Sequence, residues 1–108
     1  MKMLEEGKIL YFKEVYFMDV KRLNLSAGVV TDFNFNKDCA EFLIKNFSDS
    51  DIIVCMGNFD ISKSIKIISN AFEIISDVNE ETGIRTKKSY NKLSIKSESG
   101  GEVEVRCL

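Results

Sequence analysis

Few residues in this chain could carry catalysis, because its 108 residues include no histidine. The missing imidazole excludes Ser-His-Asp and Cys-His pairs and every histidine metal ligand. Cys39 is the best-placed nucleophile, since we expect it in the first turn of a helix, where the dipole lowers a thiol pKa. The neighbouring Asp38 opposes a thiolate, however, and a free cysteine often packs as a small apolar residue. We therefore assign no catalytic residue and predict that the protein is not an enzyme.

Two pairs of carboxylates, Asp49 with Asp51 and Glu80 with Glu81, are of the type that serves in acid–base catalysis or cation binding. Neither pair fits the calcium-loop pattern, which also needs a glycine and a distal glutamate. The turn from Met56 to Asp60 carries one glycine before an expected helix, but no P-loop lysine follows it. The sequence thus predicts no metal and no cofactor, and it places these acids in solvated loops.

The charges are unevenly distributed along the chain. The segment 82–97 has five basic residues and no acid, which leaves ten basic and 17 acidic residues elsewhere, a net charge of −7. A basic strip with an interleaved tyrosine is typical of a nucleic-acid-binding surface, although lysines also protect sheet edges and an acidic body repels polyanions. The alternative hypothesis is therefore a nucleic-acid-binding module. The residues it assigns to nucleic-acid contact are Arg85, Lys87, Lys88, Tyr90, Lys92 and Lys96.

The preferred functional hypothesis is a small acidic protein-binding module. Its most specific form is an inhibitor, such as an immunity protein or antitoxin that neutralises a basic toxin nuclease, or a phage-type inhibitor of a host system. Acidic loops would imitate phosphate and steer association with such a partner. The residues proposed for this role are Asp49, Asp51, Asp77, Glu80 and Glu81. The sequence leaves open a homo-oligomer, and also a binding surface on an aromatic N-terminal hairpin instead of these acids.

The cysteine count and the apolar runs bear on the compartment. The three cysteines, Cys39, Cys55 and Cys107, form no C-x-x-C pair, and their odd number argues against a disulfide framework and a zinc site. The longest apolar run, Ile52 to Met56, is far shorter than the roughly 20 residues of a membrane helix. Glu5 and Glu6 interrupt the region where a signal peptide would be apolar. We therefore expect a cytoplasmic protein without a membrane segment.

The elements that would position these residues follow from hydrophobic periodicity. Segments 8–18 and 23–35 are predicted to form a long N-terminal hairpin, with a bulge or bend at Gly28. For segment 8–18 a helix is the alternative, because Ile9, Phe12 and Tyr16 also have helical spacing. A helix is expected from Asn36 or Asp38 to Phe47. The apolar run from Ile52 to Met56 predicts a central strand, with Cys55 in the core.

A second helix is predicted after an N-cap at Asp60, from the spacing of Ile61, Ile65, Ile68, Phe72, Ile75 and Val78. Segments 90–96 and 102–107 would form a C-terminal hairpin around Gly100 and Gly101. The expected fold is a single domain, 1–108, of the α+β class. It is a two-layer sandwich of order ββαβαββ, with a mostly antiparallel sheet of about five strands and two helices on one face.

Overall fold

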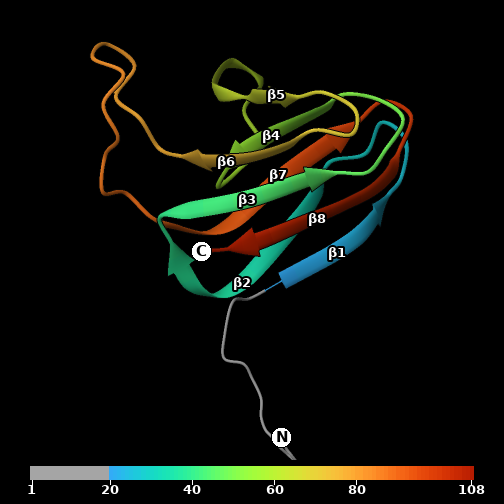
Figure 1. The fold of residues 1–108 in the computed structure, drawn as a ribbon, viewed down its shortest axis with the longest axis horizontal. Coiled ribbons are helices and arrows are strands. Elements are labelled where there is room, and N and C mark those ends of the chain that lie inside the picture. The colour runs from blue at the N-terminus through green and yellow to red at the C-terminus, as the bar shows by residue number, and fades with distance from the viewer. Residues whose placement is uncertain (1–19) are drawn as a thin grey trace, which may run out of the picture.

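The computed structural model describes residues 20–108, which form two antiparallel sheets packed face to face (Figure 1). The strand order is β1-β8-β3-β6 in one sheet and β2-β7-β4-β5 in the other. A short 3₁₀ helix, η1 (Ile61–Lys63), lies between β4 and β5. The strands are β1 (Val20–Leu25), β2 (Thr31–Cys39), β3 (Glu41–Asn46), β4 (Ile52–Met56), β5 (Ile65–Ile67), β6 (Phe72–Ser76), β7 (Tyr90–Ser97) and β8 (Gly101–Cys107).

The core lies between the inner faces of the two sheets. Side chains of a strand alternate between its faces, so one face can be apolar while the other is polar. In β7 the buried Leu93 and Ile95 alternate with Lys92 and Lys96, which are only partly buried. The largest fully buried apolar side chains are Phe33, Phe42, Ile44, Ile52, Val54, Ile67, Leu93, Ile95, Val103 and Val105.

The described residues contain no α-helix, so the α+β prediction is wrong for this part of the chain. The expected helix from Asn36 or Asp38 to Phe47 is instead the end of β2 followed by β3. Phe42, Ile44 and Asn46 face the core at a period of two residues. The sequence does not show this alternation clearly, because the polar Asn46 occupies one of the core positions and the apolar Leu43 lies on the opposite face.

The expected second helix is replaced by η1, β5 and β6. Asp60 does act as an N-cap, because its Oδ1 accepts a hydrogen bond of 3.1 Å from the Ser62 backbone amide, but only one 3₁₀ turn follows. The segment is rich in isoleucine, whose β-branch favours strands. Ile61, Ile68 and Phe72 of the expected buried stripe are more than half exposed, which shows that the helical spacing was coincidental.

The predicted hairpins also need correction. Segment 8–18 lies outside the described residues, and segment 23–35 is divided between β1 and β2, with Gly28 (φ +71°) in the connecting turn. The expected central strand, β4, is confirmed, since it pairs with β7 and β5. The C-terminal strands have nearly the predicted bounds, but β7 and β8 belong to different sheets and do not pair. Among the described strands, β4 and β5 alone are consecutive and paired.

A buried polar network closes one end of the sandwich around Asn46. Its fully buried amide Nδ2 donates to the carbonyl oxygens of Ser50, Ile67 and Ile68, while Oδ1 accepts from the backbone and hydroxyl of Ser48. Buried polar groups are stable only when they are hydrogen-bonded in this way. The network thereby holds the β3–β4 and β5–β6 connections together.

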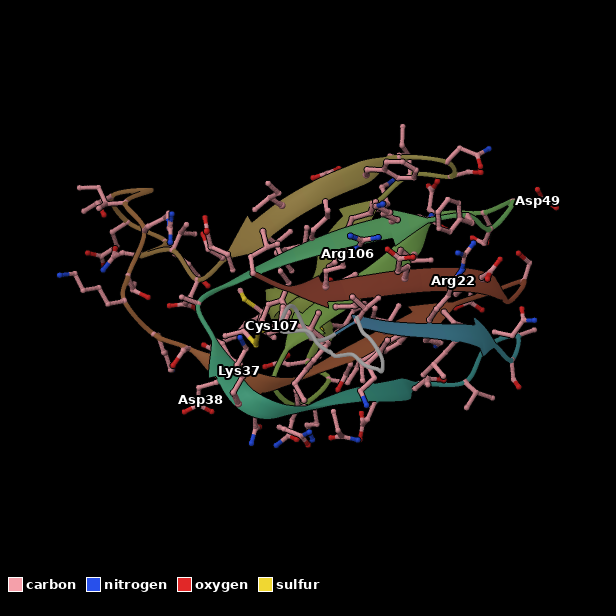
Figure 2. The ribbon with its side chains drawn as sticks, turned by 60° about the horizontal axis from the view of Figure 1, so that its bottom comes forward. Arg22, Lys37, Asp38, Asp49, Arg106 and Cys107 are labelled. Atoms are coloured by element: carbon pink, nitrogen blue, oxygen red, sulfur yellow. A yellow bond between two sulfur atoms is a disulfide. The ribbon has the colours of Figure 1, made fainter. Side chains whose placement is uncertain are left out.

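The two sheets are also joined covalently. Cys39 at the end of β2 forms a disulfide with Cys107 at the end of β8, with 5.6 Å between their Cα atoms (Figure 2). The expectation that these cysteines would stay unpaired is therefore wrong. An odd count excludes a complete set of pairs, but it does not exclude one pair with a third cysteine left free. That cysteine is Cys55, which is buried in β4 as predicted.

Candidate functional site

The outer face of the β1-β8-β3-β6 sheet presents two rows of side chains that run across all four strands. Cross-strand pairing places Val20, Arg106, Leu43 and Ile74 in one row. The adjacent row is Arg22, Glu104, Lys45 and Phe72. Phe42 and Ile44 point to the core from β3, so Leu43 and Lys45 between them must point outward. Figure 2 shows Arg106 and Arg22 along this surface.

A nearly buried carboxylate organises the charged row. The Glu104 side chain is 7% exposed and lies 2.7 Å from Arg106 Nε, 3.6 Å from Arg22 Nη1 and 3.7 Å from Lys45 Nζ. Burial by itself would raise the pKa of Glu104, but the hydrogen bond and charge of Arg106, with the charges of Lys45 and Arg22, hold that pKa below its usual value. The carboxylate therefore stays ionised and fixes three cations on the face of the sheet.

An apolar patch lies beside this network on the edge strand β6. Phe72 and Ile74 are 55% and 60% exposed, and the partly buried Leu43 is the direct cross-strand neighbour of Ile74. We call Leu43, Phe72 and Ile74 the β6 patch. Scattered exposed apolar residues are ordinary on protein surfaces, whereas contiguous ones mark interaction sites. Ile68, Val78 and Ile84, in the chain segments before and after β6, are also exposed.

Aromatic contacts connect the patch to the cations. The Phe72 ring lies edge-on to Phe47 at a centroid distance of 5.4 Å. Lys45 Nζ is 5.4 Å from the centroid of Phe72, and the Arg22 guanidinium is 4.7 Å from that of Phe47. Such contacts place cations over the electron-rich faces of the rings. Phe72 is thus held by two neighbours although 55% of it is exposed.

The acids proposed from the sequence do not form one surface. The connection that holds Asp49 and Asp51 follows the Asn46 end of β3, whereas Asp77 follows β6 at the Glu41 end, since Glu41 pairs with Ser76. Figure 2 shows Asp49 at one end of the molecule and the β6–β7 connection, drawn in orange, at the other. Asp51 is also engaged locally, with Ser69 N at 3.3 Å and Lys66 Nζ at 3.8 Å.

Asp77 anchors a projecting loop that holds Glu80 and Glu81 (Figure 1). Its carboxylate accepts hydrogen bonds from Thr86 Oγ1 at 2.6 Å and from the Tyr90 hydroxyl at 3.1 Å. The Thr86 bond is the main cause of a lowered pKa for Asp77, to which the Tyr90 bond and nearby lysines add while burial acts in the opposite direction. Asp77 thus has a structural role, and Glu80 and Glu81 remain exposed in the loop.

Ion pairs partly neutralise the basic segment. Arg85 Nη1 lies 2.8 Å from Glu41 Oε2, Lys92 Nζ 3.8 Å from Asp32 Oδ2, and Lys96 Nζ 3.4 Å from Glu98 Oε2. In addition, Lys88 lies over the ring of Tyr90 at 5.6 Å and Lys87 is exposed. Arg85, Lys87 and Lys88 belong to the projecting β6–β7 connection, whereas Lys92 and Lys96 lie on the outer face of the other sheet. The six residues therefore do not form a continuous basic strip.

Sequence reasoning missed the β6 patch and the cations beside it. The order Phe72-Glu73-Ile74 does alternate apolar and polar residues, as in a strand, but helical spacing was preferred there. The partners Leu43, Arg22 and Glu104 come from three other strands, so their proximity depends on sheet order. A single sequence carries no signal for that order.

Within residues 20–108 the structure shows no pocket and no cluster of three metal-ligating side chains. No helix in the described range has the length and apolar character needed to cross a membrane. A comparison with family models, curated proteins and solved structures finds no match to the chain.

Proposed function

We propose that this protein is a small protein-binding module that contacts its partner through the outer face of the β1-β8-β3-β6 sheet. The observation that carries the proposal is the β6 patch, in which an aromatic and a branched aliphatic side chain are each more than half exposed beside Leu43. Interface centres are enriched in aromatic residues and arginine and surrounded by polar groups. The patch has this composition, with Arg22, Lys45 and Arg106 beside it.

The rigidity of the surface supports the proposal. Binding is weakened when flexible side chains must be ordered, so a prearranged surface loses less free energy on association. Here Glu104 fixes Arg106 through a hydrogen bond of 2.7 Å, and Phe47 and Lys45 contact Phe72. A partner that covered the patch would therefore meet side chains that already occupy defined positions.

Variants with a new charge in the patch test this proposal. Phe72→Asp and Ile74→Asp should abolish co-purification of a specific partner from the source cells, because each would bury an unpaired carboxylate in the interface. The matched control is Ile61→Asp, which changes a residue that is 62% exposed in η1, beside the other sheet. Ile74→Asp and Ile61→Asp should keep a melting temperature close to that of the wild type. Phe72→Asp also loses the contact with Phe47, so its binding is compared only after circular dichroism shows that it is folded. Equal retention of the partner by all three variants would refute a role for the patch.

We also propose, as the specific form of this function, inhibition of a basic nucleic-acid enzyme. Its support is confined to the exposed Glu80 and Glu81 in the loop that follows β6, because the sheet face itself carries the cations Arg22, Lys45 and Arg106. The double variant Glu80→Lys/Glu81→Lys should then slow association with the partner and reduce its salt dependence, since charges at a rim mainly steer encounter. If the association rate of the double variant equalled that of the wild type at both low and high salt, electrostatic steering by Glu80 and Glu81 would be refuted. The proposed role of the β6 patch would not be affected by that result.

Two other expectations from the sequence lose support in the structure. Nucleic-acid binding loses support because three of the five basic side chains of segment 82–97 pair with acids. The cytoplasmic location expected from the sequence loses support because the chain contains a disulfide.

A further inference from the structure

The Cys39–Cys107 disulfide is buried in the interior of the molecule. Cys39 is 1% exposed and Cys107 is fully buried, and both belong to the apolar core cluster. The neighbouring Phe42 pairs with Cys107 across the strands and packs against Phe35, with 5.6 Å between the ring centroids. Thiol–disulfide exchange requires a thiolate to reach one of the sulfur atoms. A dissolved reductant therefore cannot attack this bond while the sandwich stays folded.

The remaining cysteine is shielded as well. Cys55 is 2% exposed, and its Sγ lies 3.3 Å from both the backbone nitrogen and the backbone oxygen of Asp60. All three cysteines of the chain belong to the described residues, so the native protein presents no exposed thiol. Disulfides with catalytic or sensing roles in reducing cells are exposed or strained ones that exchange readily. This arrangement is instead that of a structural crosslink.

We infer that the protein matures and resides in an oxidising compartment, where a thiol–disulfide oxidant closes Cys39–Cys107 before or during the final packing of β8. One cysteine thiolate attacks the oxidant's disulfide and forms a mixed disulfide, with release of one oxidant thiolate. The second cysteine thiolate then attacks the mixed disulfide, the Cys39–Cys107 bond forms and the oxidant leaves as a dithiol. Two electrons pass to the oxidant, and the two protons of the cysteine thiols are taken up by its two sulfur atoms. The inference rests on the cysteines and is independent of the proposed binding function.

Acid trapping of thiols in the source cells tests the inference. Cells are quenched in acid, the protein is denatured and alkylated with a maleimide, and the adducts are counted by mass spectrometry. We expect one adduct, at Cys55, and three after prior reduction of the sample. The control variant Cys55→Ser should give none, and Cys39→Ser should give two. Three adducts on the unreduced wild-type protein would overturn the inference.

Cell fractionation of the same samples tests the compartment. The oxidised chain should be recovered with secreted or envelope proteins, or with the contents of an oxidising organelle. Recovery with cytosolic markers would contradict residence in an oxidising compartment, even if the chain carried the disulfide.

Discussion

Removal of the disulfide is the perturbation whose consequence follows most directly from the structure. The double variant Cys39→Ala/Cys107→Ala deletes the crosslink without leaving a buried free thiol. The unfolded chain then regains the freedom that the closed loop had removed, while the folded sheets keep their pairing. The chain should become less stable mainly through its unfolded state.

The size of the effect follows from the length of the loop. The disulfide spans 68 residues in sequence. In the chain-entropy model a closed loop of this length stabilises the folded state by about 4 kcal/mol at 25 °C. Small domains are stable by roughly 5 to 15 kcal/mol in total, so the double variant should be marginal. For a domain of this size the corresponding fall in melting temperature is about 15 to 30 °C.

Urea denaturation followed by circular dichroism measures this loss. The free energy of unfolding should fall by about 4 kcal/mol in the double variant. Wild-type protein that is unfolded, reduced and then refolded in the presence of reductant should show a similar loss. Cys55→Ala is the control, because it changes a buried cysteine that closes no loop. Its smaller cost should be that of a local cavity and a weak sulfur hydrogen bond. A double variant that loses less than about 1 kcal/mol would show that the loop-closure reasoning is wrong.

Three further predictions concern other parts of the fold. Asn46→Ala should cost at least about 3 kcal/mol in urea denaturation, because several buried groups lose their partners, whereas the exposed control Asn34→Ala should change stability by less than about 0.5 kcal/mol. Gly100→Ala should lower the melting temperature more than Gly28→Ala. Both positions have positive φ, but a Cβ at residue 100 would lie 2.6 Å from the Leu25 carbonyl oxygen and one at residue 28 would meet no atom within 4 Å. Asp77→Asn should destabilise the protein at neutral pH. The difference from wild type should shrink as pH falls from about 4, since the lowered pKa of Asp77 gives stability present above the unfolded-state pKa and lost as the folded carboxylate protonates. A difference that is the same at pH 7 and pH 3 would contradict this role.

The sequence predicted the strands best where alternation was regular or the apolar run was compact. β4 was found from the run Ile52 to Met56, and the bounds of β7 and β8 were nearly right. The crossing of these last two strands to opposite sheets was missed, because a short glycine-containing connection is equally compatible with a hairpin. The choice depends on which partner strands are available, and β7 pairs with β2 and β4 while β8 pairs with β1 and β3.

The two helix predictions failed for a common physical reason. A strand that carries apolar residues on both of its faces lacks the alternation of apolar and polar residues by which a strand is recognised in a sequence. Leu43 beside the buried Ile44, and Phe72 three positions before the buried Ile75, have the spacing of a helical stripe. Two of the residues with this misleading spacing, Leu43 and Phe72, belong to the β6 patch. Local pattern and global fold therefore disagree at this surface.

The site residues could be predicted only in part. The exposed acids of the β6–β7 connection were placed correctly in a loop, but the structural role of Asp77 depends on Thr86 and Tyr90 across that connection. The Glu104 network draws on three strands that lie far apart in the sequence. Such groupings follow from strand order, which local propensity does not determine.

Site-specific photocrosslinking tests the proposed binding surface most directly. A benzophenone side chain is placed at position 74 in the patch, or at position 61 as the control, and the source cells are irradiated. The proposed function predicts a covalent adduct of one defined mass from position 74 and none from position 61. No adduct at either position, or the same adducts at both, would contradict the assignment of the β6 patch as the partner-binding surface.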